Sequence, residues 1–347
     1  MDSFIRDNLP PAELWPERDF SGVPELDYPE RLNCVSELLD HWVTAGHGDA
    51  PVFHFGDATW SYADLQEKTN RIARVLVEDL GIQPGNRVLL RAPNNPMLVA
   101  CWMAAAKAGA VVVATMPLLR HHELAYIIEK AQVEVALCDI ALWDELSKAQ
   151  EEAPGLRDVR TFTNDGTGSE SLEQAMAVKL PQFDSVDTAA EDPVLVAFTS
   201  GTTGHPKGTV HFHRDILAMC DTFARYVAKI DPRDIFTGSP PVAFTFGLGA
   251  LVAFPMRFGA STVLVEKFGP TTLLETIDRY QVTGIYTAPT AYRAMLSSVG
   301  DYSLQSLKQC FSAGEHLPKP TWEAWHEATG IKIIDGIGST EMLHIFI

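Results

Sequence analysis

The stretch PVLVAFTSGTTGHPKG, residues 193–208, joins an apolar run to a loop of glycines, hydroxyl side chains and one lysine. Residues 193–199 have the continuous apolar character of a buried strand. In the loop that follows, glycines let the backbone approach a ligand closely, hydroxyl groups can donate to its oxygen atoms, and Lys207 adds a positive charge. The stretch therefore predicts a polyphosphate-binding loop at the end of a strand, followed by a helix.

The spacing of this loop differs from two common nucleotide-binding loops. Five positions after Gly201 stands Pro206, where a Walker A loop has its second glycine. A dinucleotide-binding GxGxxG is also absent, because Gly336-Ile337-Gly338 is followed at the third position by Glu341. The alternative is a flexible loop without a ligand, which ten consecutive residues of this kind after a buried strand disfavour.

Away from this loop, apolar strand patterns alternate with helix patterns. Alternation at this spacing is typical of βαβ units, and it predicts an α/β fold made of two doubly wound lobes. The expected strands are 88–92, 110–115, 133–138, 193–199, 261–266, 284–289, 309–314 and 332–338. The expected helices are 97–107, 121–132, 141–150, 215–229, 248–257, 271–281, 290–298 and 318–328.

Four segments are expected along the chain. Residues 1–50 are rich in proline and charge at their start and are expected to wrap the surface, and residues 51–163 form the first lobe. Residues 164–192 carry Gly, Ser, Asp and Pro without periodicity and form a connector. Residues 193–347 form the second lobe, with the phosphate loop and a ligand pocket. The sequence stops in an apolar run that resembles a strand cut short, so we expect a truncated chain.

The charge balance limits the classes of partner. Twenty-seven Lys and Arg against 45 Asp and Glu give a net charge of −18, which argues against nucleic acid or an anionic membrane as the main partner.

Five dispersed cysteines form neither a disulfide framework nor a zinc-finger pattern. Residues 97–119 are interrupted by Lys107 and Gly109, so a membrane span is not expected. With no secretory signal visible, we expect a cytoplasmic protein.

A second motif, DGIGSTE at 335–341, also follows an expected strand. A carboxylate beside hydroxyl groups and glycine fits a hard cation such as Mg²⁺, which takes oxygen ligands. A tight turn capped by Ser or Thr would give the same pattern. Two further glycine turns, AFTFGLG at 243–249 and SAGEH at 312–316, are either part of a site or merely structural.

Two Glu-x-x-His pairs suggest a carboxylate-bridged di-iron site as a rival. They are Glu323 with His326 and Glu341 with His344. Such a site needs four facing helices. Because this chain alternates strands and helices, the di-iron interpretation is disfavoured.

The remaining histidines are given structural interpretations. His211 and His213 share a face only on a strand, and no third metal ligand is apparent. Residues 120–123, Arg-His-His-Glu, are expected to be the polar start of a helix. No GxSxG elbow occurs, so serine hydrolase chemistry lacks a nucleophile.

The motifs quoted above carry a resemblance. TSGTTGHPKG (199–208) closely resembles the phosphate-binding signature of the adenylate-forming, or AMP-binding, enzymes, which include acyl-CoA synthetases, peptide-synthetase adenylation domains and firefly luciferase. GSTE (338–341) resembles their second signature. Four other stretches look like the benzoate-CoA ligase branch: FTFGLG (244–249), TAPTAYRAML (287–296), SAGEHLP (312–318) and DGIGSTEMLHIF (335–346). The N-terminal stretch RDNLPP…ELDYPERLN (6–33) is most similar to its 2-aminobenzoate-CoA ligases.

The resemblance implies an aryl-CoA ligase with ATP, Mg²⁺ and coenzyme A. A carboxylate, benzoate or 2-aminobenzoate, would attack the α-phosphate of ATP, and the coenzyme A thiol would then displace AMP. The barrel subdomain and the mobile C-terminal domain of the family are largely missing from the sequence. Two alternatives therefore stay open: a non-catalytic nucleotide-binding fragment, and an adenylation module that loads a carrier protein.

The resemblance also implies roles for individual residues. Lys207, Thr340 and Glu341 would be catalytic, Thr340 by contacting the α-phosphate and Glu341 by holding Mg²⁺ with Thr199. The ATP site would comprise Thr199, Ser200, Gly201, Thr202, Thr203, Gly204, Lys207, Gly314, Glu315, His316, Asp335, Gly336, Ile337, Gly338, Ser339 and Thr340. The aryl ring would face Thr245, Phe246 and His344, with Gly314 and Ile337 nearby. The apolar and aromatic character of this last set suits a flat aromatic acid.

Overall fold

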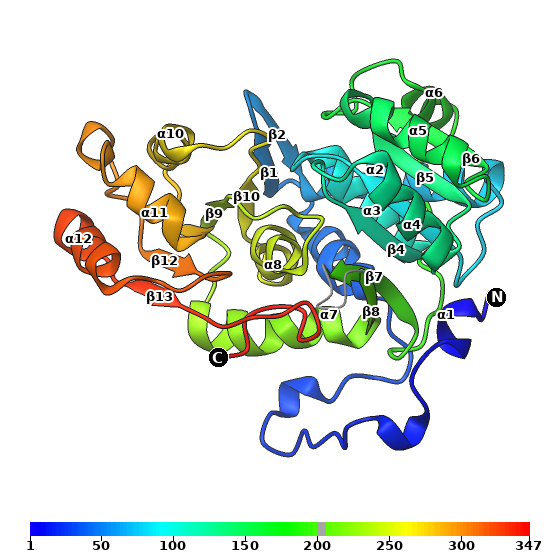
Figure 1. The fold of residues 1–347 in the computed structure, drawn as a ribbon, viewed down its shortest axis with the longest axis horizontal. Helices are drawn as coiled ribbons and strands as arrows, with labels where there is room; N and C mark the ends of the chain where they lie inside the picture. Colours follow the sequence, from blue (N-terminus) through cyan, green and yellow to red (C-terminus); the bar gives the residue numbers. More distant parts are fainter. Residues whose placement is uncertain (200–205) are drawn as a thin grey trace.

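The structure is a computed structural model that describes residues 1–199 and 206–347. Two sheets with helices on both faces make up the molecule (Figure 1). The six-stranded sheet has the order β6 (Asp158–Phe162), β5 (Val135–Asp139), β3 (Arg87–Arg91), β4 (Val111–Thr115), β7 (Pro193–Thr199), β8 (Lys207–Phe212). The seven-stranded sheet has the order β13 (Ile333–Asp335), β12 (Gln309–Ser312), β11 (Gly284–Thr287), β9 (Ile235–Gly238), β10 (Ser261–Val263), β1 (Pro51–Phe55), β2 (Ala58–Ser61).

Helices follow most strands. The α-helices are α1 (Phe4–Asp7), α2 (Tyr62–Arg74), α3 (Pro96–Lys107), α4 (His121–Ala131), α5 (Trp143–Glu152), α6 (Ser171–Ala177), α7 (His213–Met219), α8 (Thr245–Leu248), α9 (Phe254–Arg257), α10 (Pro270–Tyr280), α11 (Pro289–Met295) and α12 (Lys319–Thr329). The other helical turns are Ala12–Leu14, Pro24–Leu26, Ser36–Asp40, Val43–His47, Val75–Asp79, Ile140–Leu142, η7 (Cys220–Ala228), η8 (Gly249–Ala253) and Val299–Asp301.

The six-stranded sheet is covered on both faces. Along β3, Leu89 packs with α4 and α5, whereas its neighbours Val88 and Leu90 pack with α2 and α3. Strand residues alternate between faces, so apolar residues at every position bury both sides of a sheet. All twelve residues of α3 are buried. The predicted doubly wound arrangement is confirmed for this sheet.

The seven-stranded sheet is built in the same way. Ile285 of β11 and Cys310 of β12 pack with α10, α11 and α12 on one face. On the other face, Tyr286 and Phe311 join the same core as α3, η7 and the run from α8 to α9. A single apolar core therefore connects the two sheets, and it fixes the strand ends of the second sheet relative to the first.

The sheets do not follow the expected ranges 51–163 and 193–347. β1 pairs in parallel with β10, with Phe53 opposite Thr262, so β1 and β2 extend the second sheet. β7 pairs with β4 through Leu195 and Val112, so β7 and β8 extend the first. Each sheet thus contains two strands from the sequence range that was assigned to the other lobe. The pairings that place them there are long-range, and no local sequence pattern reveals them. The division into domains itself stays a prediction.

A strand that was not expected lies between the predicted phosphate loop and the expected helix 215–229, which the structure shows as α7 and η7. β8 begins at Lys207 and runs antiparallel to β7, with Thr199 opposite Lys207, and α7 starts only at His213. The physical reason is the alternation in β8, where Val210 packs in the core between two polar positions. Residues 200–205 lie outside the described part of the chain.

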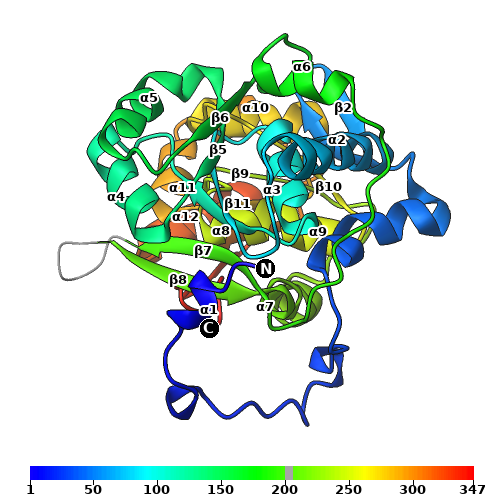
Figure 2. The same ribbon diagram turned by 90° about the vertical axis from the view of Figure 1, so that its right-hand side faces the viewer.

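The N-terminal segment runs over the outside of the body before it enters the core (Figure 2). Asn33 donates to the backbone of Ala106 at 3.0 Å, and the Tyr28 hydroxyl donates to Asp221 at 2.9 Å. The segment expected to be an irregular connector contains α6, because Leu172 and Met176 bury one helical face. No helix in the ranges 1–199 and 206–347 is long and apolar enough to cross a membrane.

Candidate functional site

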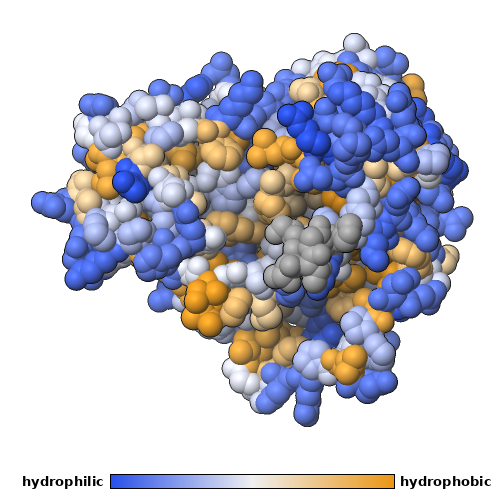
Figure 3. All heavy atoms as spheres, in the orientation of Figure 1, coloured by the Kyte–Doolittle hydropathy of each residue, from blue (hydrophilic) through white to orange (hydrophobic). Residues whose placement is uncertain are grey.

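A cavity lies at the carboxyl ends of the parallel strands of the second sheet. β9, β11, β12 and β13 point the same way, and the residues that follow each of them line a space of about 530 Å³. In open α/β sheets, ligands bind at this edge. The face drawn in Figure 3 is hollowed near its middle, with apolar residues around the hollow. The lining includes Ser239, Phe244, Thr245, Phe246, Phe268, Thr290, Gly314, Glu315, Gly338, Ser339, Thr340 and His344.

The turn after β12 is shaped by a glycine and a carboxylate. Gly314 has a φ of +94°, a conformation that side chains with a Cβ rarely adopt. The next residue, Glu315, accepts a hydrogen bond from the backbone N–H of Thr290 at 2.9 Å. Hydrogen bonding by the Thr290 side chain and backbone lowers the pKa of the Glu315 carboxyl. Glu315 therefore ties the turn to the first turn of α11. Its backbone, with Gly314, forms the cavity wall.

Two side-chain hydrogen bonds connect the ends of neighbouring strands at this edge of the sheet. Ser239 Oγ lies 2.5 Å from Thr287 Oγ1, which joins the end of β9 to the end of β11. The Ser312 hydroxyl donates to the Asp335 carboxylate, which joins β12 to β13. These short polar side chains hold the edge of the sheet in register, because each bond spans adjacent strands.

His344 closes one side of the cavity inside an aromatic cluster. Only 2% of the residue is exposed, and its ring centroid lies 4.4 Å from that of Phe254 and 5.3 Å from that of Phe246. A Cβ on Gly249 would meet the His344 ring at 2.4 Å, so only glycine allows this approach. Burial lowers the pKa of His344 to about 3, against a smaller opposing effect of the Phe246 backbone. The imidazole is therefore neutral at physiological pH.

A histidine on β8 binds the backbone of the second predicted motif, residues 335–341. His211 Nε2 lies 2.7 Å from the Thr340 carbonyl oxygen, and its Nδ1 lies 3.9 Å from an Asp215 carboxylate oxygen. Burial lowers the pKa of His211, so the ring is neutral and donates from Nε2. His211 thus links the strand that follows the predicted phosphate loop to the GSTE motif. This contact agrees with the structural interpretation of His211 and adds a partner that the sequence did not indicate.

His213 fits its structural interpretation. It is fully buried, and its Nδ1 accepts a hydrogen bond from the backbone N–H of Cys34 at 3.1 Å. The two histidines therefore differ in role although they lie two residues apart.

The structure brings together only part of the predicted site. The cavity collects Thr245, Phe246, Gly314, Glu315, Gly338, Ser339, Thr340 and His344. Asp335, Gly336 and Glu341 line a neighbouring groove of about 780 Å³. Thr199 and Lys207 pair at the loop end of the β7–β8 hairpin, and His316 is exposed. Ser200, Gly201, Thr202, Thr203 and Gly204 lie outside the described residues.

Ile337 does not lie where it was expected. It is 61% exposed and does not line the cavity, although a place beside the aryl ring was expected. The reason is a backbone pairing, since Ile337 accepts from the N–H of Phe346 at 3.0 Å and donates to Ile347 at 2.9 Å. The segment from 336 to 347 doubles back on itself, and this pairing turns the Ile337 side chain to the surface.

Sequence reasoning missed several lining residues, including Ser239, Phe268 and Thr290. A usable signal existed for two of them. Ser239 directly follows β9, and Thr290 lies three residues after β11, so the strand-end rule would have selected both. Phe268 precedes α10 without any motif, and only the fold brings it to the cavity.

Comparison with known proteins gives consistent results. Residues 39–347 match the model of the family described as AMP-binding enzyme. The chain is 32% identical over 330 residues to a benzoate–CoA ligase of Thauera aromatica, and the alignment covers 93% of this chain and 62% of the relative. It is 28% identical over 323 residues to a 3-hydroxybenzoate–CoA ligase of Aromatoleum, and this alignment covers 91% of this chain and 61% of the relative. The chain thus spans about three fifths of the length of these relatives.

Two solved structures extend this comparison. The crystal structure of the anthranilate CoA ligase AuaEII in complex with anthranoyl-AMP aligns with a TM-score of 0.87 and 29% identity, over 93% of this chain and 62% of that one. A benzoate CoA ligase from Burkholderia xenovorans aligns with a TM-score of 0.82 and 26% identity, over 91% and 63%. Both the sequence and the fold therefore match the same group of proteins.

Proposed function

This chain belongs to the family of AMP-binding enzymes, as its motifs predicted, and we propose that it activates an aromatic carboxylate with ATP for transfer to coenzyme A. The observation that carries the proposal is the cavity in which the GSTE motif and the aromatic cluster around His344 meet. The lining of this cavity combines the hydroxyl side chains of Ser339 and Thr340 with the aromatic rings of Phe246 and His344. A site of this composition suits a flat acid whose carboxylate must reach a phosphate.

In the first step, an oxygen of the substrate carboxylate attacks the α-phosphorus of ATP. The new P–O bond gives the acyl-AMP, and the bond to the β-phosphate oxygen breaks to release pyrophosphate. Such chemistry depends on positioning and on charge neutralisation. We assign Lys207 and Thr199, at the mouth of the β7–β8 hairpin, to the outer phosphates, and Thr340 to the α-phosphate.

Mg²⁺ is assigned to Glu341. Its exposed carboxylate directly follows Thr340, and the pair offers the oxygen donors that Mg²⁺ prefers. When bound, the ion neutralises charge on the phosphates. Glu341 would hold the ion on the side of the larger groove, where Asp335 also lies.

The aromatic end of the cavity selects the acid. Phe246 and the neutral His344 ring are 5.3 Å apart between centroids and give apolar faces to the substrate ring. A charged histidine covered by an apolar ring would be buried without a counter-ion, at a high cost in free energy. Burial lowers the pKa of His344, so the ring carries no charge. We therefore propose benzoate or 2-aminobenzoate as the substrate, in line with the relatives named for benzoate and anthranilate.

In the second step, the thiol of coenzyme A attacks the acyl carbon, the thioester bond forms, and AMP leaves. A carrier-protein thiol would use the same acyl-AMP, and a chain that only binds nucleotide would form none. Incubation of the chain with ATP, Mg²⁺, the acid and coenzyme A, followed by mass spectrometry, separates these cases. Aroyl-CoA supports the proposal, acyl-AMP alone restricts it to the first step, and no acyl-AMP with either acid contradicts it.

A further inference from the structure

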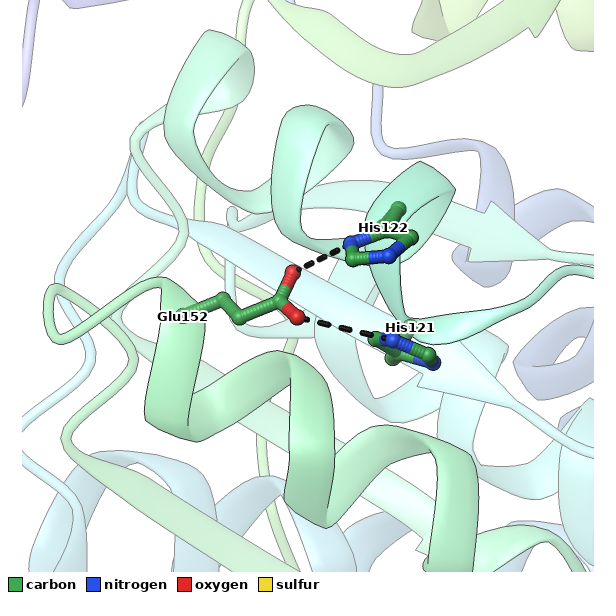
Figure 4. A group of neighbouring side chains, drawn as sticks. All are labelled: His121, His122 and Glu152. Atoms are coloured by element: carbon green, nitrogen blue, oxygen red, sulfur yellow. Dashed lines mark hydrogen bonds and ion pairs between the residues drawn. The ribbon is translucent and has the colours of Figure 1, made fainter.

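A second cluster of ligand-type side chains lies far from the cavity, on the helices that cover the six-stranded sheet. His121 and His122 begin α4, and Glu152 ends α5 (Figure 4). Their side chains converge from the two helices, and one ligand atom from each lies within 4.8 Å of the other two. We propose that His121, His122 and Glu152 bind a Zn²⁺ ion, a site independent of the proposed ligase reaction.

The two His–Glu distances are close to those that a tetrahedral zinc ion imposes, and all three ligand atoms lie within 4.8 Å of one another. His122 Nδ1 lies 2.9 Å from one oxygen of Glu152, and His121 Nε2 lies 3.5 Å from the other. Zinc ligands at about 2.0–2.2 Å from the ion lie about 3.3 Å from one another in a tetrahedron. An ion placed between the three side chains would replace their present contacts with only small movements.

The rings of the two histidines lie against each other at the start of α4. Their ring centroids are 4.0 Å apart, with the planes tilted by 48°. Without an ion, this cluster offers only partly exposed His–Glu contacts, and exposed ion pairs contribute little, about 0–1 kcal/mol. Stability alone therefore does not explain it.

A further carboxylate orients the inner histidine. His121 Nδ1 lies 3.1 Å from a Glu145 oxygen, which also accepts from the His121 backbone N–H at 3.0 Å. The other oxygen of Glu145 accepts a hydrogen bond from Lys148 Nζ at 3.1 Å. A carboxylate that accepts from the second nitrogen of a histidine is the usual support of a zinc ligand. Glu145 fixes the ring so that Nε2 faces Glu152.

The choice of ion follows from the ligand atoms. Two imidazole nitrogens and one carboxylate oxygen form a set typical of zinc with one position open to water, whereas Mg²⁺ and Ca²⁺ prefer oxygen ligands. Other transition metals of similar character, such as Ni²⁺ and Cu²⁺, would bind the same atoms. Mg²⁺ at millimolar concentration should therefore not displace the bound zinc.

Calorimetric titration of the full 347-residue chain, without an affinity tag and stripped of metal, with ZnCl₂ tests the site. We expect saturable binding of one ion per chain, which His122→Ala and Glu152→Gln weaken at least tenfold. Glu145→Gln should keep the stoichiometry and weaken binding about 10–100-fold, as expected for a residue that orients a ligand. The exposed His41, far along the sequence from both helices, provides the control variant His41→Ala, which should bind as the wild type does.

Cobalt substitution gives a second readout that does not depend on affinity. Co²⁺ in a four-coordinate site absorbs visible light strongly, and we expect this absorption in the wild type and its loss in His122→Ala. The proposal is overturned if the wild type binds no stoichiometric zinc, if both ligand variants bind it equally well, or if Mg²⁺ displaces it. None of these results depends on ATP or on an acid, so failure here leaves the proposed ligase function untouched.

Discussion

His211 on β8 donates a hydrogen bond from Nε2 to the backbone carbonyl of Thr340, with 2.7 Å between the two atoms. Four residues before His211 on the same strand, and on the same face, stands Lys207. With a rise of about 3.3 Å per residue, these two side chains start about 13 Å apart. The strand therefore carries Lys207, which we propose to contact the phosphates, at one end and the anchor of the GSTE motif further along.

The first prediction concerns this anchor. Replacing His211 by alanine should lower the rate of acyl-AMP formation about tenfold or more, since a loss of about 1.4 kcal/mol corresponds to tenfold. His211→Gln, whose amide can still donate to the Thr340 carbonyl, should recover much of the rate. Steady-state kinetics with ATP as the varied substrate checks this. Equal losses in both variants would contradict a positioning role.

The second prediction concerns the aromatic end of the cavity. His344→Ala should change the preference between benzoate and 2-aminobenzoate more than it changes the apparent KM for ATP. The reason is that the His344 ring packs against Phe254 and against Phe246, the side chain proposed to face the acid. Measurement of kcat/KM for both acids tests this. If both acids lose activity by the same factor, His344 does not shape the acid site.

The third prediction concerns pH and stability. Burial lowers the pKa of His213 to about 3, whereas an unfolded histidine titrates near 6.5. Between these values the unfolded state binds the extra proton, so stability is lost as the pH falls from about 6.5 towards 3. The slope reaches about 1.4 kcal/mol per pH unit for one such group.

The variant His213→Asn isolates this contribution. Its side-chain oxygen can still accept from the Cys34 N–H, but it does not titrate. Urea unfolding at several pH values should therefore show a shallower acid dependence than in the wild type, by about one proton. Identical slopes in the two proteins would show that His213 titrates normally in the folded state.

The fourth prediction concerns a buried charge that joins three parts of the chain. Asp221 is fully buried and contacts Arg225 at 2.6 Å, Arg257 at 3.0 Å and the Tyr28 hydroxyl at 2.9 Å. Asp221→Asn removes the buried carboxylate that Arg225 and Arg257 share, although Arg257 keeps its contact with Glu37 at 2.9 Å. Because a buried ion pair is broken, it should lower the free energy of unfolding by about 3 kcal/mol. Urea denaturation measures this loss.

A matched surface pair provides the control for Asp221. Asp231 and Arg233 form an ion pair at 2.7 Å in which the Arg233 side chain is 88% exposed and that of Asp231 is 43% exposed. Asp231→Asn should change the free energy of unfolding by less than about 1 kcal/mol, because exposed pairs contribute little. Similar losses in the two variants would contradict the importance of burial at Asp221.

Much of the fold could be predicted because its signals are local. The twelve buried residues of α3 and the valine-rich β4 form continuous apolar runs that identify a helix and a strand from sequence alone. The sheet membership of β1 and β7 was not predictable in this way. Both depend on long-range pairing, Phe53 with Thr262 and Leu195 with Val112, which no window of sequence contains.

The site was predictable to a similar degree. Thr340 and Gly314 belong to short motifs at strand ends, and the structure places both at the cavity. The role of His211 was missed because its partner, the Thr340 carbonyl, lies 129 residues away. Ile337 was misplaced because a backbone pairing with Phe346 turns it outward. The His121–His122 pair was expected at the polar start of a helix, and α4 does begin at His121. Its proximity to Glu152 could not be predicted, because it depends on the packing of α4 against α5.

The most direct test of the proposed function is carboxylate-dependent ATP–pyrophosphate exchange by this 347-residue chain, with benzoate and 2-aminobenzoate. We predict exchange that requires Mg²⁺ and one of these acids and that is strongly reduced in Lys207→Ala, with an unchanged circular dichroism spectrum. The exposed Lys130 on α4 supplies the control Lys130→Ala, which should exchange at the wild-type rate. A folded sample whose exchange with either acid stays at the acid-free background would contradict the assignment of the adenylation step to this chain.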